Sequence, residues 1–121
     1  MNSEELKRIL TDKGLAQFGD SLLNFAYSIS ATRTTGKPKG FKVPDTVLAE
    51  AATKAGLRKL LPSRVNRGEV ANSLEAILGY AWLEKILTLD EVVTFLSDQF
   101  NLIPSENFAR VGKMVLARLT S

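Results

Sequence analysis

The stretch Leu15-Ala-Gln-Phe-Gly-Asp-Ser-Leu-Leu-Asn-Phe-Ala-Tyr-Ser-Ile-Ser-Ala31 is largely apolar and carries a single charge, Asp20. A second stretch, Val70-Ala-Asn-Ser-Leu-Glu-Ala-Ile-Leu-Gly-Tyr-Ala-Trp-Leu83, carries only Glu75. In the first stretch apolar residues recur at spacings of three and four, which is typical of a core-facing helix. A carboxylate buried in such a helix is costly unless a cation, hydrogen-bond donors or a raised pKa relieves it. The two stretches therefore predict a helical core that contains two acids in need of a partner.

The rest of the chain also reads as helices, because no stretch keeps the alternation of a strand. The first helix is expected from Ser3 to a stop at Gly14, and a basic loop is expected over 32–44. A helix from Asp45 or Thr46 to Gly56 and a short turn over 57–61 should follow. The remaining elements are a helix over 69–87, a helix from a capping box at Thr88 and Glu91 through Phe100, and a last helix capped by Ser105. We predict an all-α fold of about six to seven helices, in one domain over residues 1–121.

The composition excludes several kinds of chemistry. The chain has no cysteine and no histidine, which rules out disulfides, thiolate sites, ordinary zinc sites and hydrolases that use an imidazole base. Any metal would meet oxygen ligands, which favours magnesium, manganese or calcium. No apolar run approaches the roughly 20 residues of a membrane-spanning helix, and the amino terminus lacks a signal-peptide pattern. We therefore expect a cytoplasmic protein without a membrane segment.

The net charge of +3 hides a segregation along the chain. Between Arg33 and Gly68 there are nine basic residues against two acidic ones, which gives that span a charge of +7 and the remainder −4. The basic residues are Arg33, Lys37, Lys39, Lys42, Lys54, Arg58, Lys59, Arg64 and Arg67. Such a region suits a polyanion held beside acids and metal ions, and it equally suits a solvated basic surface.

The helical period places polar residues of the two acidic stretches on shared faces. Asp20 and Asn24 are four residues apart, and Asn72 and Glu75 are three apart. If the two helices cross at these points, Asp20 and Glu75 can bind one hard cation, with Asn72 offering an amide oxygen. Magnesium usually takes only one or two protein carboxylates and completes its octahedron with water and substrate phosphate.

The glycines Gly19 and Gly79 would let the two helix backbones approach closely. A purely structural interpretation stays open for both acids. Asp20 would then be hydrogen-bonded to a neighbouring helix start, and Glu75 would form a salt bridge with a basic residue folded over it.

Three motifs carry a resemblance to a known family. Leu15-Ala-Gln-Phe-Gly-Asp-Ser-Leu-Leu23 resembles the signature helix of the ribonuclease III family, whose core is Leu-Glu-Phe-Leu-Gly-Asp-Ser/Ala. Asn72-Ser-Leu-Glu-Ala-Ile-Leu-Gly-Tyr80 is similar to the family's second acidic motif, Asp-x-x-Glu-Ala-Leu-Ile-Gly. Between them, Asp45-Thr-Val-Leu-Ala-Glu-Ala-Ala-Thr-Lys-Ala-Gly-Leu57 resembles the family's Asn-Glu-x-Leu-Ala-x-x-Ala-x-x-Leu-Gly-Leu segment. The order and the spacing of the three motifs agree.

The resemblance implies an all-helical, dimeric catalytic domain that cuts double-stranded RNA with magnesium and usually has four acids. Asp20 and Glu75 match two of those acids, whereas Ala16 and Asn72 stand where the family has a glutamate and an aspartate. The Mini-ribonuclease III subgroup, which lacks a double-stranded-RNA-binding domain, likewise has a small residue and a non-aspartate at these positions. We therefore expect a compact domain similar to that subgroup.

The resulting hypothesis is a metal-dependent endoribonuclease acting on double-stranded RNA. Asp20 and Glu75 would be catalytic and, with Asn72, would bind Mg²⁺ or Mn²⁺. Contacts with RNA phosphates are expected from Arg33, Lys37, Lys39, Lys42, Arg64 and Arg67. The alternatives are a ribonuclease III fold that has lost cleavage and keeps RNA binding or dimerisation, and a helical protein-interaction module.

Overall fold

The computed structural model describes residues 1–98 and 103–121, and within them the chain forms six α-helices and one turn of 3₁₀ helix. The elements are α1 (Ser3–Leu10), α2 (Lys13–Thr35), α3 (Asp45–Lys54), η1 (Leu57–Leu60), α4 (Arg67–Leu83), α5 (Leu89–Leu96) and α6 (Pro104–Thr120). None of the described residues lies in a strand. The all-α prediction is therefore confirmed.

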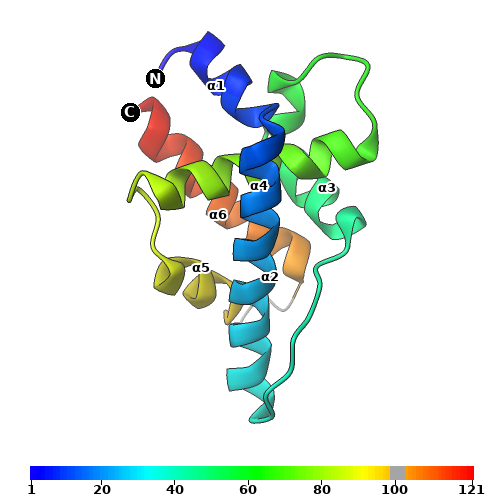
Figure 1. The fold of residues 1–121 in the computed structure, drawn as a ribbon, viewed down its shortest axis with the longest axis vertical. Helices are drawn as coiled ribbons and strands as arrows, with labels where there is room; N and C mark the ends of the chain where they lie inside the picture. Colours follow the sequence, from blue (N-terminus) through cyan, green and yellow to red (C-terminus); the bar gives the residue numbers. More distant parts are fainter. Residues whose placement is uncertain (99–102) are drawn as a thin grey trace.

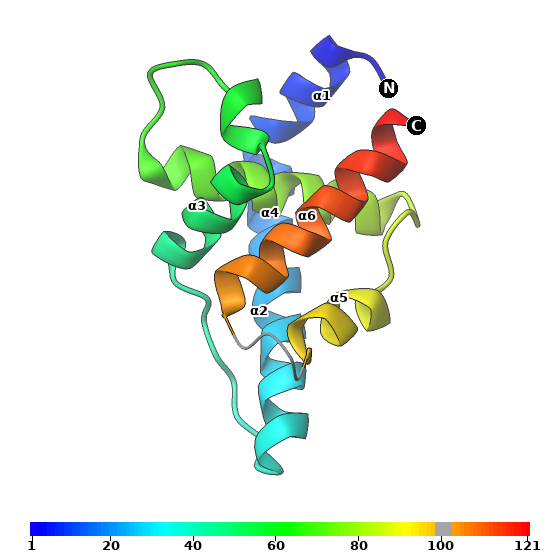
Figure 2. The ribbon, with the colours of Figure 1, turned by 180° about the vertical axis from the view of Figure 1, so that it is seen from behind.

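Helix α4 is the centre of the molecule. It lies between α2 on one side and α6 on the other, and it also packs against α1 and α3 (Figures 1 and 2). Leu74, Ile77 and Leu78 of α4 are completely buried. A helix that packs against several neighbours needs apolar residues on most of its surface, and this explains why the stretch around Glu75 is so strongly apolar.

Helices α2 and α4 cross at the two glycines that the sequence singled out. A Cβ atom on Gly19 would overlap the carbonyl oxygen of Glu75, and one on Gly79 would lie 2.9 Å from the carbonyl oxygen of Leu15. The predicted close approach of the two acidic helices is therefore confirmed, and it places Asp20 and Glu75 at the same crossing.

The first two helix boundaries differ from the expected ones. Asn2 instead of Ser3 caps α1, because its side chain accepts a hydrogen bond from the amide of Glu5. Helix α1 ends at Leu10, and Asp12 caps α2 through the amide of Leu15, so Gly14 lies inside α2 and does not end a helix.

Helix α2 continues past the expected start of the basic loop. It runs to Thr35 and ends at Gly36, whose φ of 76° is the left-handed conformation that glycine adopts without strain. The extra turn makes α2 long, and its carboxyl-terminal end extends beyond the other helices (Figure 1). The loop over 36–44 then runs back along the carboxyl-terminal half of α2 toward α3.

Three further boundaries differ for local reasons. Pro44 precedes α3, so Asp45 lies in its first turn and does not cap it. Asn66 and Glu69 form a capping box that starts α4 at Arg67, and α4 ends at Leu83. Pro104 is the first residue of α6, so Ser105 lies inside that helix.

The capping box predicted at Thr88 and Glu91 is present and starts α5 at Leu89. Phe100, which was expected to belong to this helix, lies outside the described residues. In the part of the chain that the structure describes, helices long and apolar enough to span a bilayer are absent.

Candidate metal and nucleic-acid site

The two isolated acids meet in one cleft. The cleft has a volume of about 340 Å³ and lies where α2 crosses α4, beside the loop that leads into α3. Its lining residues are Lys13, Ala16, Gln17, Asp20, Lys42, Asp45, Asn72 and Glu75. Asp20 comes from α2, and Asn72 and Glu75 come from α4. All three residues that the sequence proposed as metal ligands therefore lie together.

Glu75 is nearly inaccessible to solvent, with 3% of its surface exposed. Burial raises the pKa of its carboxyl group to about 8, and a hydrogen bond with Asp20 and the charges of Asp20 and Asp45 act in the same direction. The positive charge of Lys42 opposes this shift only in part. Among the described residues, no basic side chain forms an ion pair with Glu75. The structural interpretation, in which Glu75 forms a salt bridge, is therefore not observed.

Asp20 is half-buried and, besides its contact with Glu75, accepts a hydrogen bond from its own helix. The Nδ2 atom of Asn24, one turn further along α2, donates to Oδ1 of Asp20 at 3.2 Å. The alternative in which a neighbouring helix start satisfies Asp20 is therefore also not observed. The Asp20 carboxylate instead faces the Glu75 carboxyl group.

The amide group of Asn72 is oriented by two acceptors. One of its terminal atoms lies 3.2 Å from the carbonyl oxygen of Gly68 and 3.3 Å from Oε1 of Glu75. Since both neighbours are acceptors, this atom must be the nitrogen, and Asn72 donates a hydrogen bond to Glu75. Ligation of a metal by the Asn72 oxygen would require the amide to turn over.

The donor atoms fit a hard divalent cation. With a pKa of about 8, the Glu75 carboxyl group is mostly protonated at neutral pH, and a cation bound beside it and Asp20 would favour loss of the proton. No group of three or more acidic, histidine or cysteine side chains near enough to bind a metal occurs among residues 1–98 and 103–121. Two carboxylates are within the number that magnesium takes from a protein, the remaining positions being filled by water and phosphate oxygens.

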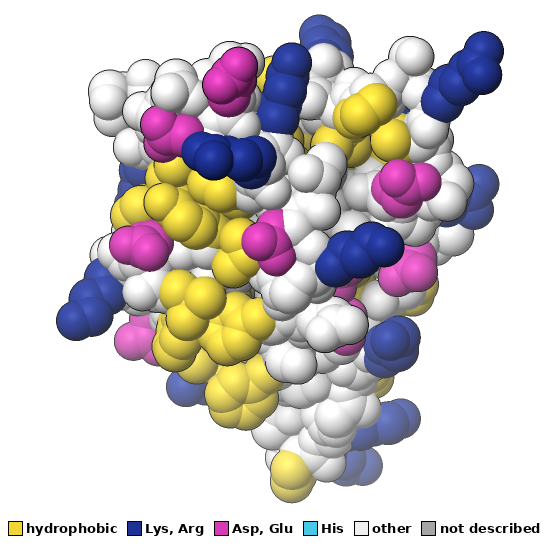
Figure 3. Space-filling model, turned by 45° about the horizontal axis from the view of Figure 1, so that its top comes forward, with side chains coloured by type: hydrophobic (Ala, Val, Ile, Leu, Met, Phe, Trp, Pro, Cys, Tyr) yellow, Lys and Arg dark blue, Asp and Glu magenta, His cyan; other side chains and the backbone are white. Residues whose placement is uncertain are grey.

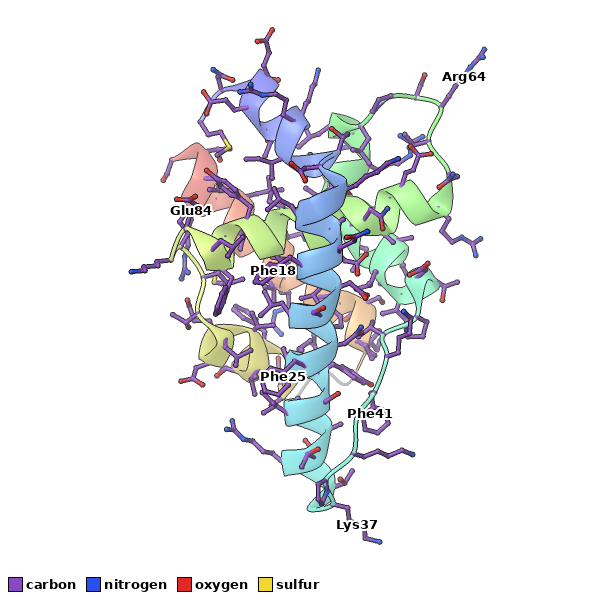
Figure 4. The ribbon with its side chains drawn as sticks, in the orientation of Figure 1. Phe18, Phe25, Lys37, Phe41, Arg64 and Glu84 are labelled. Atoms are coloured by element: carbon purple, nitrogen blue, oxygen red, sulfur yellow. The ribbon has the colours of Figure 1, made fainter. Side chains whose placement is uncertain are left out.

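The basic residues proposed from the sequence lie at different distances from the cleft. Lys42 lines the cleft itself, and Lys37 and Lys39 follow the same loop away from it along α2. Arg64 projects from the loop between η1 and α4, away from the body of the molecule, and Lys37 projects at the far end of α2 (Figure 4). The two remaining predicted residues are Arg33 in the last turn of α2 and Arg67 at the first position of α4.

The sequence interpretation missed three residues of the cleft: Lys13, Gln17 and Asp45. Lys13 and Gln17 lie on the same face of α2 as Asp20, at multiples of about one turn, so helical periodicity alone would have found them. Asp45 reaches the cleft only because the loop over 36–44 folds back along α2. No spacing in the sequence reports such a return.

A separate apolar area lies on another face of α2. Phe18 and Trp82 are in ring contact, with centroids 5.6 Å apart, yet 36% and 39% of their surfaces are exposed. Phe25 and Leu83 are more exposed still, at 59% and 49%. Figure 3 shows hydrophobic side chains gathered on one part of the surface, and Figure 4 shows Phe18 and Phe25 on the same side of α2. We call Phe18, Phe25, Trp82 and Leu83 the apolar patch.

The comparison with known families agrees with the motifs and the fold. A family model described as Ribonuclease III matches residues 13–120, which includes both acidic helices and the basic loop. The chain belongs to the ribonuclease III family. A search among curated proteins found no match.

Proposed function

We propose that this protein is a metal-dependent endoribonuclease that hydrolyses phosphodiester bonds in double-stranded RNA. The observation that carries the proposal is the meeting of Asp20 and Glu75 in one cleft of a ribonuclease III family chain. A bound Mg²⁺ or Mn²⁺ ion would lower the pKa of a water molecule and stabilise negative charge on the scissile phosphate.

In this proposal the residues of the cleft have distinct roles. Asp20 and Glu75 are the catalytic residues that hold the ion, and Glu75 must first give up the proton that its burial retains. Asn72 donates to Glu75 and so orients its carboxyl group, or it turns to offer its oxygen. Lys42 and Lys13 bring positive charge to the edge of the cleft, where a phosphate group would lie.

Binding of duplex RNA would depend on phosphate contacts along the carboxyl-terminal end of α2 and the loop that follows it. Arg33, Lys37 and Lys39 are all exposed there, and Arg64 and Arg67 are exposed on the other side of the cleft. The base edges of A-form RNA lie in a deep, narrow groove, so recognition would follow the shape of the backbone and not the sequence. The affinity should fall steeply with added salt, because each phosphate contact releases a counterion.

The apolar patch supports a homodimer as the active assembly. Aromatic side chains such as Phe25 and Trp82 are the kind of residue that protein interfaces bury. A second copy of the chain is the occupant that we propose for the patch, since two copies would present two cleavage sites to one duplex.

Binding of structured RNA without cleavage is the second candidate function. It is favoured by Ala16 and Asn72, which stand where the family usually has acids, and by the absence, among the described residues, of three acids close enough together to bind one metal ion.

Incubation of the purified protein with duplex RNA and Mg²⁺ or Mn²⁺ tests both candidates. We expect the parent to cleave, Asp20→Asn and Glu75→Gln to lose cleavage, and all three to bind the duplex at low salt. Cleavage that persists in both variants would exclude this site, and binding without cleavage in either metal would support the second candidate. Failure of the parent to bind duplex RNA even at low salt would leave a protein-interaction role.

A further inference from the structure

A row of polar side chains on α2 holds the basic loop in place. Asn24, Ser28 and Thr32 follow one another at intervals of four residues, and each accepts a hydrogen bond from a backbone amide of the loop. The donors are the amides of Val43 at 2.8 Å, Phe41 at 2.8 Å and Lys39 at 3.2 Å, respectively. We call residues 37–43 the strap.

Asn24 differs from the other two because both ends of its side chain are used. Its Oδ1 accepts from Val43, and its Nδ2 donates to Asp20. The backbone amide of Val43 can only donate, so the oxygen of Asn24 must face the strap and its NH₂ group must face Asp20. The orientation of the amide is thus set by the strap.

We propose that Asn24 is a positioning residue that holds the Asp20 carboxylate in the cleft and connects it to the strap that carries Lys42. This inference rests on the proposed function, because it assigns Asn24 a role at the same metal site. Lys42, which lines the cleft, precedes Val43 in the sequence. Two neighbouring residues of the strap therefore have two roles: Lys42 brings a positive charge to the cleft, and Val43 fixes the Asn24 amide that donates to Asp20.

A carboxylate that is held in place binds a cation better than a free one. A side chain that is already ordered loses less rotational freedom when the ion binds. Loss of a partner that orients a metal ligand typically weakens metal binding 10- to 100-fold.

Ser28 provides a matched control. Ser28 lies one turn after Asn24 on α2, and its Oγ accepts a hydrogen bond from the amide of Phe41 in the strap. Its other hydrogen bonds are to backbone oxygens, and it makes none with Asp20. Ser28→Ala therefore loosens the strap without touching the acid, whereas Asn24→Leu removes both contacts and keeps a side chain of similar size. Ser28→Ala shows the effect of losing one bond to the strap, and a larger loss in Asn24→Leu then reports the Asn24 amide itself, which contacts both Asp20 and Val43.

The experiment is titration of the full chain with Mn²⁺ alone, followed by the electron paramagnetic resonance signal of the free ion, together with thermal unfolding of each variant. We expect Asn24→Leu to weaken Mn²⁺ binding about 10-fold, Ser28→Ala to bind Mn²⁺ as the parent does, and both variants to unfold cooperatively.

Parent-like binding by Asn24→Leu, or equal weakening by Ser28→Ala, would overturn the inference while leaving the metal site intact. The variant Asp20→Asn distinguishes failure of the role of Asn24 from failure of the metal site itself. If that variant binds Mn²⁺ as tightly as the parent, or if the parent binds none, the proposed metal site fails and the role of Asn24 fails with it.

Discussion

Glu75 is an acid that the fold keeps protonated when no cation is present. Its pKa is raised from 4.5 to about 8, chiefly by burial, so between these values the folded state holds a proton that the unfolded chain has lost. The free energy of unfolding must then decrease as the pH rises through this window. Glu75→Gln cannot ionise and should escape the decrease. At pH 8.5 with a chelator, we expect it to be more stable than the parent by roughly 2–4 kcal/mol, measured by urea unfolding.

Two comparisons make this result specific to the buried acid. At pH 5, where Glu75 is protonated in the folded state, the parent and Glu75→Gln should have nearly equal stability. Glu84→Gln alters an exposed acid at the end of the same helix and should behave as the parent at both pH values. A parent whose stability does not change between pH 5 and pH 8.5 would contradict the raised pKa.

At the residue scale, the sequence predicted the two acids because each is the only charge in a long apolar stretch, Asp20 within 15–31 and Glu75 within 70–83. Asn24 was placed on the face of Asp20 by helical spacing, but its hydrogen bond to Val43 was not predicted, since the strap returns from a distant part of the chain. The orientation of the Asn72 amide depends on Gly68 and Glu75 together, and it becomes visible only when the positions of their acceptor atoms are known.

At the scale of helices, the crossing of α2 and α4 depends on Gly19. A methyl group at this position would overlap the backbone of Glu75, and backbone atoms of a packed helix cannot move aside as a flexible side chain can. We expect Gly19→Ala to destabilise the protein by about 3 kcal/mol, although alanine is the better helix former. Thermal unfolding monitored by circular dichroism measures this change.

Ser21→Ala is the control for helix propensity, because Ser21 is an exposed residue two positions further along α2. It should leave stability unchanged or raise it slightly. A Gly19→Ala variant as stable as the parent would mean that the backbones of α2 and α4 leave room for a methyl group at this position.

Glu91 has contacts both at the start of α5 and with α6, the last helix of the chain. It closes the capping box of α5 with Thr88, and its carboxylate pairs with Arg118 of α6 at 2.6 Å. The bond from Arg118 lowers the pKa of Glu91 to about 2, so the associated stability is present above the unfolded value of 4.5 and is lost as the pH falls toward 2. We expect Glu91→Gln to cost about 1 kcal/mol at pH 7 and much less at pH 2.

Urea unfolding at the two pH values measures this loss. Asp90→Asn, which changes an exposed acid in the same first turn without a capping role, should cost less at pH 7. Equal losses in the two variants would show that the first-turn charge matters and that the contact with Arg118 does not.

Helix starts were predictable where the sequence offered one candidate cap, as at Thr88 and Glu91. They were misplaced where two candidates competed, as with Asn2 and Ser3, because the choice depends on which side chain reaches the free amides. The end of α2 was misplaced because Thr32, Thr34 and Thr35 are weak helix formers on their own, and contacts with the strap stabilise the last turn.

At the scale of the whole molecule, α2 separates two surfaces with different chemistry. One face carries Asp20 and the polar row, and another carries Phe18 and Phe25 of the apolar patch. The sequence could not distinguish these aromatic residues from core residues, because their spacing fits the same apolar helix face as the buried Leu22 and Ala26. Only the packing of α2 against its neighbours shows which of them remain exposed.

Phe25 allows the proposed dimer to be tested without disturbing the core. Because 59% of its surface is exposed in a single chain, Phe25→Glu should leave the helix content and the midpoint of thermal unfolding of the monomer nearly unchanged. In a dimer that buries the patch, the same substitution would place a charge in an apolar interface, which is costly.

In sedimentation equilibrium we expect the parent to have twice the chain mass of 13.3 kDa and Phe25→Glu to have the chain mass itself. Ala117→Glu introduces the same charge at an exposed position of α6 and should remain dimeric. A parent that is monomeric at all concentrations, or a Phe25→Glu variant with the parent's mass, would show that a second copy does not cover the apolar patch.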